Sequence, residues 1–234
     1  MHFENYGSTA IGIHENSDYR WLSLDGAIQS VFANAEPHRP VLPHLSAMLL
    51  ALRYCPAPNK ILELGLGGGA MQRFFQRYFP QTLITSIENN QRIIQLCKDW
   101  FEPDAPIKRI IEGDAQQKIL EYHHQDIVIV DLFSRTGSPD FVSTPEFFKN
   151  CVNSLHDDGL LVINLITPLQ MKIELTLELL RQQKLHFRTF SIPGFQNRVI
   201  IAAQKPLPMI DYSPELNNFA NYYGLNLNNV VALS

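Results

Sequence analysis

Short apolar runs alternate with amphipathic stretches through most of the chain, from about residue 59 to residue 205. The runs predict strands, and the stretches, whose apolar residues recur every three or four positions, predict helices. The five strands predicted in this region cover residues 61–64, 83–87, 107–111, 127–130 and 160–165. Strands that alternate with helices indicate a parallel sheet with helices on both faces.

The end of this alternating region has a different pattern. After the last predicted helix, which runs from about Pro168 to Lys184, two apolar runs at residues 187–192 and 198–203 predict an antiparallel hairpin. Five strand–helix units followed by a hairpin are the pattern of the class I S-adenosylmethionine-dependent methyltransferase fold. We therefore expect an α/β protein with a Rossmann-like sheet of seven strands, mostly parallel and ending in a β-hairpin.

The first residues of the chain predict a separate small sheet. Three short runs, at residues 9–14, 19–24 and 27–31, are separated by turn-forming sequences such as Asp25-Gly26. A meander of this size cannot hold a core alone and must pack on the rest of the protein. We divide the chain into an N-terminal β meander at residues 1–36, a Rossmann-like domain at residues 37–205, and a C-terminal tail at residues 206–234 that packs on this domain.

The composition fits a globular protein. Apolar residues make up 45% of the 234 residues and charged residues 18%, so a sizeable core can form. The net charge of −4 argues against nucleic acid or a membrane surface as the partner. The first residues lack the pattern of a signal peptide, and no apolar run approaches the roughly 20 residues that span a bilayer. We expect a soluble, cytoplasmic protein.

The cysteines and histidines do not predict a metal centre. Cys55, Cys97 and Cys151 are too few and too widely spaced for a disulfide framework or a zinc site, and we expect them to be free thiols. The pair His123-His124 has no third ligand nearby in the sequence. We therefore expect no metal.

A cluster of glycines follows the first predicted strand of the Rossmann-like domain. The loop Gly65-Leu66-Gly67-Gly68-Gly69 lies between this strand and a helix. Glycine lets the backbone approach a ligand and adopt positive φ, and the start of the helix offers unpaired N–H groups. With Glu63, the loop forms the methyltransferase motif Glu-x-Gly-x-Gly-x-Gly. The loop predicts a site for a nucleotide or adenosyl cofactor; a purely structural turn is the alternative.

Three acidic residues follow three successive predicted strands. Glu88 is suited to accept hydrogen bonds from both ribose hydroxyls. Asp114 can accept from an adenine amino group, while the amide of Ala115 donates to the ring. Asp131 follows the next strand, at the edge of the sheet where ligands bind. Glu88 and Asp131 could instead be solvated acids, but the three acids together favour an adenosyl sulfonium cofactor over NAD.

Several segments resemble the spermidine synthase family of polyamine aminopropyltransferases. Residues 22–29 resemble that family's signature Leu-x-Leu-Asp-Gly-x-x-Gln, with Gln29 at its end. Residues 126–131 resemble the strand that leads into the family's active-site loop, and residues 146–148 match the start of the helix after it. Tyr222-Tyr223 faintly resembles the family's tail. The resemblance covers nearly the whole chain.

The resemblance implies a transferase that takes S-adenosylmethionine or its decarboxylated form. Aminopropyl transfer would give methylthioadenosine as a product. The acceptor would be a small molecule such as an amine, and the protein would form a homodimer. The residues expected to hold the cofactor are Gln29, Glu63, Gly65, Gly67, Gly68, Gly69, Glu88, Asp114, Ala115 and Asp131.

The active-site loop departs from the family pattern. The family's Asp-Ser-Ser-Asp-Pro is replaced by Asp131-Leu132-Phe133-Ser134-Arg135, which keeps Asp131 as a catalytic residue but has Ser134 at the position of the base. A hydroxyl cannot take a proton from an ammonium group at neutral pH. Asp140, in the same loop, is a candidate replacement. Arg135 is a candidate to pair with an anionic substrate group; a surface arginine is the alternative.

Two further positions depart from the family. The family's acid that holds the amine of decarboxylated adenosylmethionine, and repels the carboxylate of the full form, falls at Gly68, so we expect the full form to be better tolerated. The family's Tyr-His-Glu falls at Pro43-His44-Leu45, at the start of a helix predicted over residues 43–54. We assign His44 to the substrate region; a buried or capping role is the alternative.

Three functions remain open at this stage. The first is aminopropyl transfer, which Ser134 at the base position makes doubtful. The second is methyl transfer from S-adenosylmethionine to a small molecule, and the third is a catalytically degenerate homologue that keeps the nucleotide cleft. A nicotinamide-dependent oxidoreductase is disfavoured by Asp114 and by the spacing of the glycines.

Overall fold

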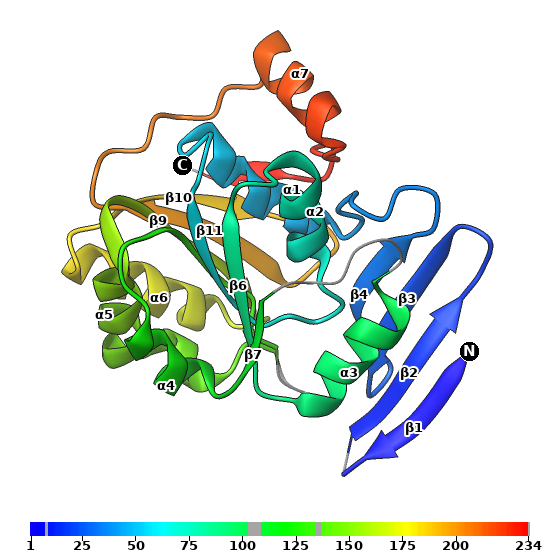
Figure 1. Ribbon diagram of the computed structural model, residues 1–234. Coiled ribbons are helices and arrows are strands. Elements are labelled where there is room, and N and C mark those ends of the chain that lie inside the picture. Colours follow the sequence, from blue (N-terminus) through cyan, green and yellow to red (C-terminus); the bar gives the residue numbers. More distant parts are fainter. Residues whose placement is uncertain (8, 103–108, 134–136, 234) are drawn as a thin grey trace.

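The larger of two β-sheets forms the centre of the protein in the computed structural model, which describes residues 1–7, 9–102, 109–133 and 137–233 (Figure 1). Its strands lie in the order β12-β10-β11-β9-β8-β5-β6-β7. They are β5 (Lys60–Leu64), β6 (Leu83–Glu88), β7 (Ile110–Glu112), β8 (Gln125–Val130), β9 (Leu155–Ile166), β10 (His186–Ser191), β11 (Asn197–Ala203) and β12 (Val231–Leu233).

The pairing of these strands is mostly parallel, as the sequence predicted. Strands β5 to β9 pair in parallel, whereas β11 is antiparallel to both β9 and β10. The larger sheet contains the seven expected strands and one more. The strand expected at residues 107–111 is observed as β7, and residues 107–108 lie outside the described residues. The tail adds β12, whose three residues pair with β10, because an edge strand offers unpaired N–H and C=O groups.

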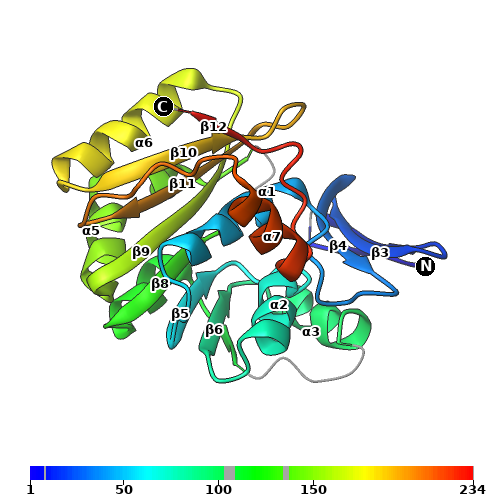
Figure 2. The ribbon, with the colours of Figure 1, turned by 90° about the horizontal axis from the view of Figure 1, so that it is seen from above.

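Helices cover both faces of this sheet (Figures 1 and 2). One face carries α1 (Pro43–Met48), the 3-10 helix η1 (Leu49–Arg53), α2 (Ala70–Tyr78) and α7 (Pro214–Tyr223). The other carries α4 (Ala115–Lys118), η2 (Ile119–Glu121), α5 (Pro145–Ser154) and α6 (Gln170–Gln182). A short η3 (Asp140–Ser143) precedes α5.

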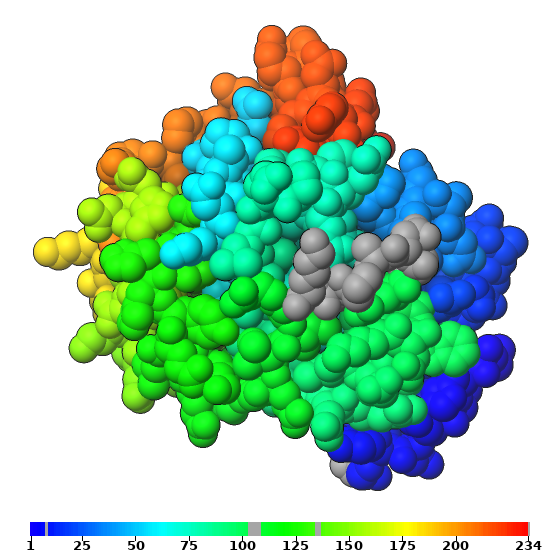
Figure 3. Space-filling model, viewed as in Figure 1, coloured from blue at the N-terminus to red at the C-terminus, as the bar shows by residue number. Residues whose placement is uncertain are grey.

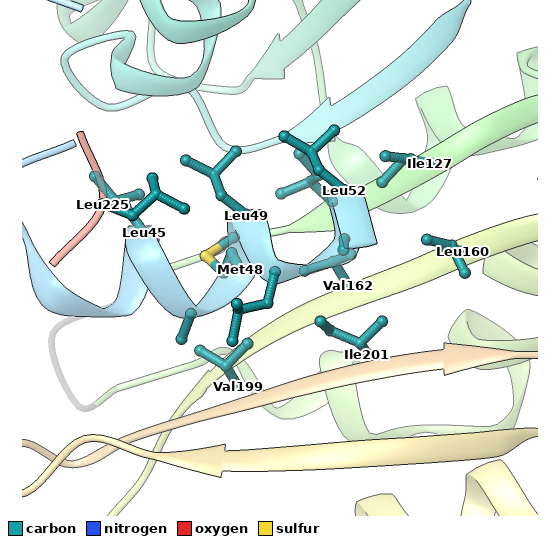
Figure 4. Packing of buried hydrophobic residues seen from close by; sticks show 14 of the residues in the cluster. Leu45, Met48, Leu49, Leu52, Ile127, Leu160, Val162, Val199, Ile201 and Leu225 are labelled. Atoms are coloured by element: carbon teal, nitrogen blue, oxygen red, sulfur yellow. The ribbon is translucent and has the colours of Figure 1, made fainter. Parts of the chain in front are cut away.

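Alternate side chains of each strand reach opposite cores. In β5, Ile61 packs under α1 and α2, whereas Leu62 packs against α5 on the other face. Figure 4 shows the first core, where Met48 and Leu52 lie against strand residues such as Val162. Because both faces are covered, the central strands are mostly apolar, which is the pattern that predicted them.

The smaller sheet comprises β1 (His2–Tyr6), β2 (Thr9–Glu15), β3 (Tyr19–Leu24) and β4 (Ala27–Ala33), in that order and all antiparallel. The sequence did not predict β1, whose residues are mostly polar. A buried cluster joins this sheet to α3 (Gln91–Trp100), with Ile11 and Phe32 against Leu96 and Phe101. The small sheet thus shares its core with the larger domain.

The C-terminal tail packs over α1 and η1. Leu216 and Ala220 of α7 are buried in the same core as Leu45 and Leu49. The space-filling view shows the tail, in orange, seated against the residues of η1 and α2 (Figure 3). Within the described ranges no helix is both long and apolar enough to cross a membrane.

The cysteines are free thiols. Cys97 and Cys151 are buried and Cys55 is half-buried. Burial raises the pKa of Cys97 to about 12 and that of Cys55 to about 11. Thiols with such pKa values form little thiolate at neutral pH, so we expect them to be unreactive.

Candidate functional site

The glycine loop crosses the ends of the central strands at close range. Gly65, Gly67 and Gly69 have φ values of +98°, +53° and +72°, which side-chain-bearing residues rarely adopt. A Cβ atom on Gly65 would lie 2.2 Å from the carbonyl oxygen of Asp131. Gly65 is therefore required both by its backbone conformation and by its contact with the end of β8.

A cavity of about 660 Å³ opens above this loop. It lies at the carboxyl ends of the parallel strands, and residues 22–30 of the small sheet form part of its wall. The predicted site residues that line it are Gln29, His44, Glu63, Gly65, Gly67, Gly68, Glu88, Asp114, Ala115 and Asp131. Gly69 is instead the N-cap residue of α2. Ser134 and Arg135 lie outside the described residues.

Glu88, at the end of β6, ties two backbone segments together. Its Oε2 accepts a hydrogen bond from the Leu66 amide at 3.2 Å, and its Oε1 accepts one from the Asn90 amide at 3.0 Å. Burial raises the pKa of this carboxyl, and these backbone donors oppose the rise. The carboxylate thus sits beside the glycine loop, where the sequence placed a ribose-binding acid.

Asp114 caps the short helix α4. Its Oδ1 accepts hydrogen bonds from the amides of Gln116 at 2.7 Å and Gln117 at 3.3 Å. Both bonds go to one oxygen, so Oδ2 is the atom that we expect to meet a ligand. The cap also fixes the position of the Ala115 amide relative to the cavity.

Glu63 is a carboxyl group that burial keeps protonated. Its side chain accepts a hydrogen bond from Ser86 Oγ, which in turn accepts one from Gln72 Nε2 at 2.7 Å. Burial raises the pKa of Glu63 to about 8, and Asp131 adds to the rise. A bound cation would lower this pKa, because a nearby positive charge favours the carboxylate.

Asp131 belongs to a chain of polar side chains that the sequence analysis did not find. Asn164 Nδ2 donates to Asp131 Oδ1 at 2.7 Å, and Asn197 Nδ2 donates to Asn164 Oδ1 at 2.9 Å. His44 Nε2 lies 3.9 Å from the other oxygen, Asp131 Oδ2. The one signal for Asn164 was a lone polar residue inside the apolar run of β9.

His44 has no capping role. Leu42 is the N-cap residue of α1, and its side chain makes no capping hydrogen bond. His44 instead points into the cavity with 13% of its side chain exposed. His44 is thus largely buried, as the alternative interpretation expects, and it also lines the cavity; its assignment to the substrate region stays a prediction.

Asp140 does not lie in the cavity, although its neighbours Pro139 and Phe141 line it. Its side chain is fully exposed and pairs with Lys172 Nζ at 3.2 Å. This exposed position outside the cavity gives no support to Asp140 as the replacement base.

Gly68 is closed to side chains in this protein. A Cβ atom there would lie 2.6 Å from Ser30 Oγ and 2.9 Å from Ser30 Cβ. Ser30, on β4, thus occupies the space into which a residue at position 68 would extend. Glycine at this position is matched to the packing of the small sheet, and its neighbour Ser30 lines the cavity as a neutral hydroxyl.

The charge of the cavity is one-sided. Five acidic residues line it, and among its described lining residues there is no lysine or arginine. The acids are Asp25, Glu88, Asp114 and Asp131, with Glu63 as a fifth that burial keeps protonated. Such a lining favours a cationic ligand and disfavours the pyrophosphate of a dinucleotide. No group of three or more potential metal ligands occurs among the described residues.

Solved structures with a similar fold define the class. A probable spermidine synthase from Corynebacterium glutamicum matches with a TM-score of 0.82 and 20% identity, covering 99% of this chain and 89% of that one. Human methyltransferase-like protein 13 in complex with SAH matches with a TM-score of 0.65 and 21% identity, covering 79% and 91%. The protein therefore has the class I methyltransferase fold found in spermidine synthases, as predicted.

Sequence comparison identifies homologues among proteins of one enzyme family. A polyamine aminopropyltransferase from Neisseria meningitidis serogroup A is 32% identical over 163 residues, which is 68% of this chain and 62% of that relative. The alignment thus spans under two thirds of the relative's length, and no protein-family model matches the chain. The chain is a homologue of polyamine aminopropyltransferases, and the predicted resemblance is confirmed.

Proposed function

We propose that this protein is a transferase that binds an adenosyl sulfonium co-substrate and acts on a small amine. The acidic cavity carries this proposal, because no lysine or arginine occurs among its described lining residues. Such a lining suits two positively charged ligands, the sulfonium co-substrate and the amine acceptor. Its homologues, named polyamine aminopropyltransferases, support the same reading.

The residues that fit the co-substrate come from one half of the larger sheet, together with Gln29 of β4 in the small sheet. We expect Glu88 to hold the ribose, and Asp114 with the Ala115 amide to hold the adenine. Gly65, Gly67, Gly68 and Gln29 would line the path of the side chain toward Asp131. The bound sulfonium supplies an electrophilic carbon and a neutral thioether as the leaving group.

The acceptor is expected beyond Asp131, where the lining changes. Leu132, Phe133 and Phe141 supply apolar wall, and Phe195 completes it from the hairpin between β10 and β11. Asn164 and Asp131 supply the polar groups at the inner end. An apolar channel that ends at a carboxylate suits a short aliphatic amine, which it holds by its charged end and shields from water.

A thermal-shift comparison tests co-substrate binding. S-adenosylmethionine, its decarboxylated form and methylthioadenosine are added to the native protein and to Glu88→Gln. A bound ligand at 100 times its Kd stabilises the native protein by about 2.7 kcal/mol, and Glu88→Gln should weaken binding at least tenfold. Glu112→Gln, an exposed strand-end acid of β7 outside the cavity, is the matched control. If none of the three ligands shifts the native protein, the proposal is wrong.

Turnover then identifies the group transferred. With decarboxylated adenosylmethionine and 1,4-diaminobutane, aminopropyl transfer releases methylthioadenosine. Methyl transfer is the second candidate, and Gly68 favours it, since no acid stands there to repel the carboxylate of the full form. In that case S-adenosylmethionine is consumed to S-adenosylhomocysteine. Binding without either product would leave a degenerate, ligand-binding homologue.

We further propose that the protein acts as a cytoplasmic homodimer that uses no metal. The outer strand of the small sheet, β1, exposes Phe3 and Tyr6 by 66% and 48%, which supports a contact through this sheet. Light scattering should give twice the monomer mass of 26.7 kDa, cell fractionation should recover the protein with the cytosol, and turnover should survive a chelator.

A further inference from the structure

His44 and Asp131 face each other across a gap at the acceptor end of the cavity. His44 Nε2 and Asp131 Oδ2 are 3.9 Å apart, which is too far for a hydrogen bond. A single ammonium nitrogen can lie about 2.9 Å from both atoms, an ordinary hydrogen-bond distance. Both side chains are partly open to the cavity, with 13% and 25% of their surfaces exposed.

Asp131 is held in one orientation by its other oxygen. Asn197 fixes the amide of Asn164, and that amide donates to Asp131 Oδ1. Asn164 is 1% exposed, so this chain of bonds is sheltered from solvent. Oδ2 is therefore the oxygen that remains turned toward His44.

The surroundings of His44 keep its imidazole neutral. Burial lowers its pKa, and the opposing effect of Asp131 is smaller. Strands β9 and β11, which pack against α1, present the uncharged Asn164 and Asn197 to this end of the cavity. The other acids that line the cavity are Asp25, Glu63, Glu88 and Asp114, but Asp131 is the acid that acts on the pKa of His44. A neutral imidazole at pH 7 can accept a proton.

We propose that His44 is the general base of the transfer reaction and that Asp131 holds the acceptor ammonium against it. This inference rests on the proposed function and replaces the base that the family pattern would have had at Ser134. Asp140, the other candidate, lies in solvent.

The proton transfer is balanced within the site. The acceptor enters as R–NH₃⁺; one N–H bond breaks, its electron pair stays on nitrogen, and the proton binds His44 Nε2. The freed amine nitrogen then forms the new C–N bond, and the C–S bond pair leaves with the thioether sulfur. Asp131 stabilises the imidazolium of His44 until His44 releases its proton to solvent.

A pH series of rates tests the role of His44. In native protein we expect the rate with 1,4-diaminobutane to reach a plateau once His44 is neutral. In His44→Gln the rate at pH 7 should fall at least 100-fold. It should then rise about tenfold per pH unit toward the pKa of the amine, because solvent must deprotonate the acceptor instead. The thermal shift with methylthioadenosine should be unchanged.

The control is His38→Gln, which makes the same change at a half-buried histidine packed on Tyr78 outside the cavity. This variant should keep the native rate and pH profile. Equal losses of rate at every pH in His44→Gln, or loss of its methylthioadenosine shift, would show that His44 is structural and overturn the proposal.

A second measurement does not depend on turnover. The imidazole resonances of His44 in the NMR spectrum should move when 1,4-diaminobutane is added and should move far less with methylthioadenosine alone. No movement with the diamine overturns the role of His44 even if the enzyme turns over. Movement of these resonances without any turnover would support the contact of His44 with the amine but would refute the proposed transfer reaction.

Discussion

Gly68 is the position at which the cavity wall leaves no room for a side chain, and Gly68→Ala tests that packing. The new Cβ atom would lie 2.6 Å from Ser30 Oγ, 2.9 Å from Ser30 Cβ and 3.3 Å from Phe101 Cδ1. The first two distances are well inside van der Waals contact, so strand β4 or the glycine loop must move. Overpacking of this kind typically costs about 1–3 kcal/mol. Because φ of Gly68 is not positive, alanine adds no strain to the backbone.

A double-mutant cycle isolates the overlap. We expect Gly68→Ala to lower the free energy of unfolding by about 2 kcal/mol. Ser30→Gly alone should cost about 0.5–1 kcal/mol, as glycine does within a strand. The double variant should cost no more than Ser30→Gly, because both serine atoms in conflict are then gone, so the coupling energy is about 2 kcal/mol. Urea unfolding with a shared m-value measures each free energy.

Gly113→Ala is the matched control. Its φ is also outside the positive range, and its Cβ atom would meet the flexible side chain of Lys118 at 2.7 Å. Since that side chain can turn away, the loss should stay below about 0.5 kcal/mol, as for surface changes. Additive costs in the Gly68 and Ser30 cycle would refute the reasoning, and so would a Gly68→Ala variant as stable as the native protein.

Three further predictions follow from buried polar groups. Burial raises the pKa of Glu63 from 4.5 to about 8, so the folded protein binds this proton more tightly than the unfolded chain does. The native protein should therefore lose stability as the pH rises from 5 to 8, at about 1.4 kcal/mol per pKa unit. Urea unfolding at both pH values should show that Glu63→Gln loses at least about 2 kcal/mol less than the native protein over this range. The buried Arg73 guanidinium donates hydrogen bonds to the carbonyls of Gly68 and Phe101. Arg73→Met should lower the free energy of unfolding by about 3–5 kcal/mol, because these carbonyls lose their donor. Asn164→Leu should leave the methylthioadenosine shift intact but lower kcat at least tenfold, because Asp131 loses its fixed orientation; a normal kcat would show that the bond is dispensable.

Most of the fold could be predicted because the central strands are buried and most of the helices between them have an apolar face. Strands β5, β8 and β11 and the second half of β9 are almost wholly buried, and the helices between the strands carry clear apolar faces. The elements that were missed lack such a signal. Strand β12 has three residues and exists only through its pairing with β10, and α7 is stabilised by burying Leu216 and Ala220 in a core formed by distant residues.

The candidate site likewise contains residues whose positions the sequence predicted and residues whose positions it did not. Glu88, Asp114 and Asp131 were predictable because parallel strands bring their carboxyl ends to one edge. The pairing of His44 with Asp131 was not, since it depends on how α1 packs across strands β9 and β11. Asn164 was missed for the same reason: its partners are fixed by tertiary structure, and a lone asparagine in a strand does not reveal them.

The strand order of the larger sheet separates the cavity into two parts that can change independently. Glu88 and the loop before Asp114 lie on the β5-β6-β7 side, whereas Asn164 and Asn197 lie on the β8-β9-β11 side. Under the proposed function, a substitution of Asn164 or Asn197 alters the acceptor's surroundings and leaves Glu88 and Asp114, which we expect to hold the adenosyl group, unchanged. If the proposed function holds, such a layout would let a lineage exchange one amine for another while it keeps the same donor, and it would give protein engineers a set of positions for changing acceptor choice alone.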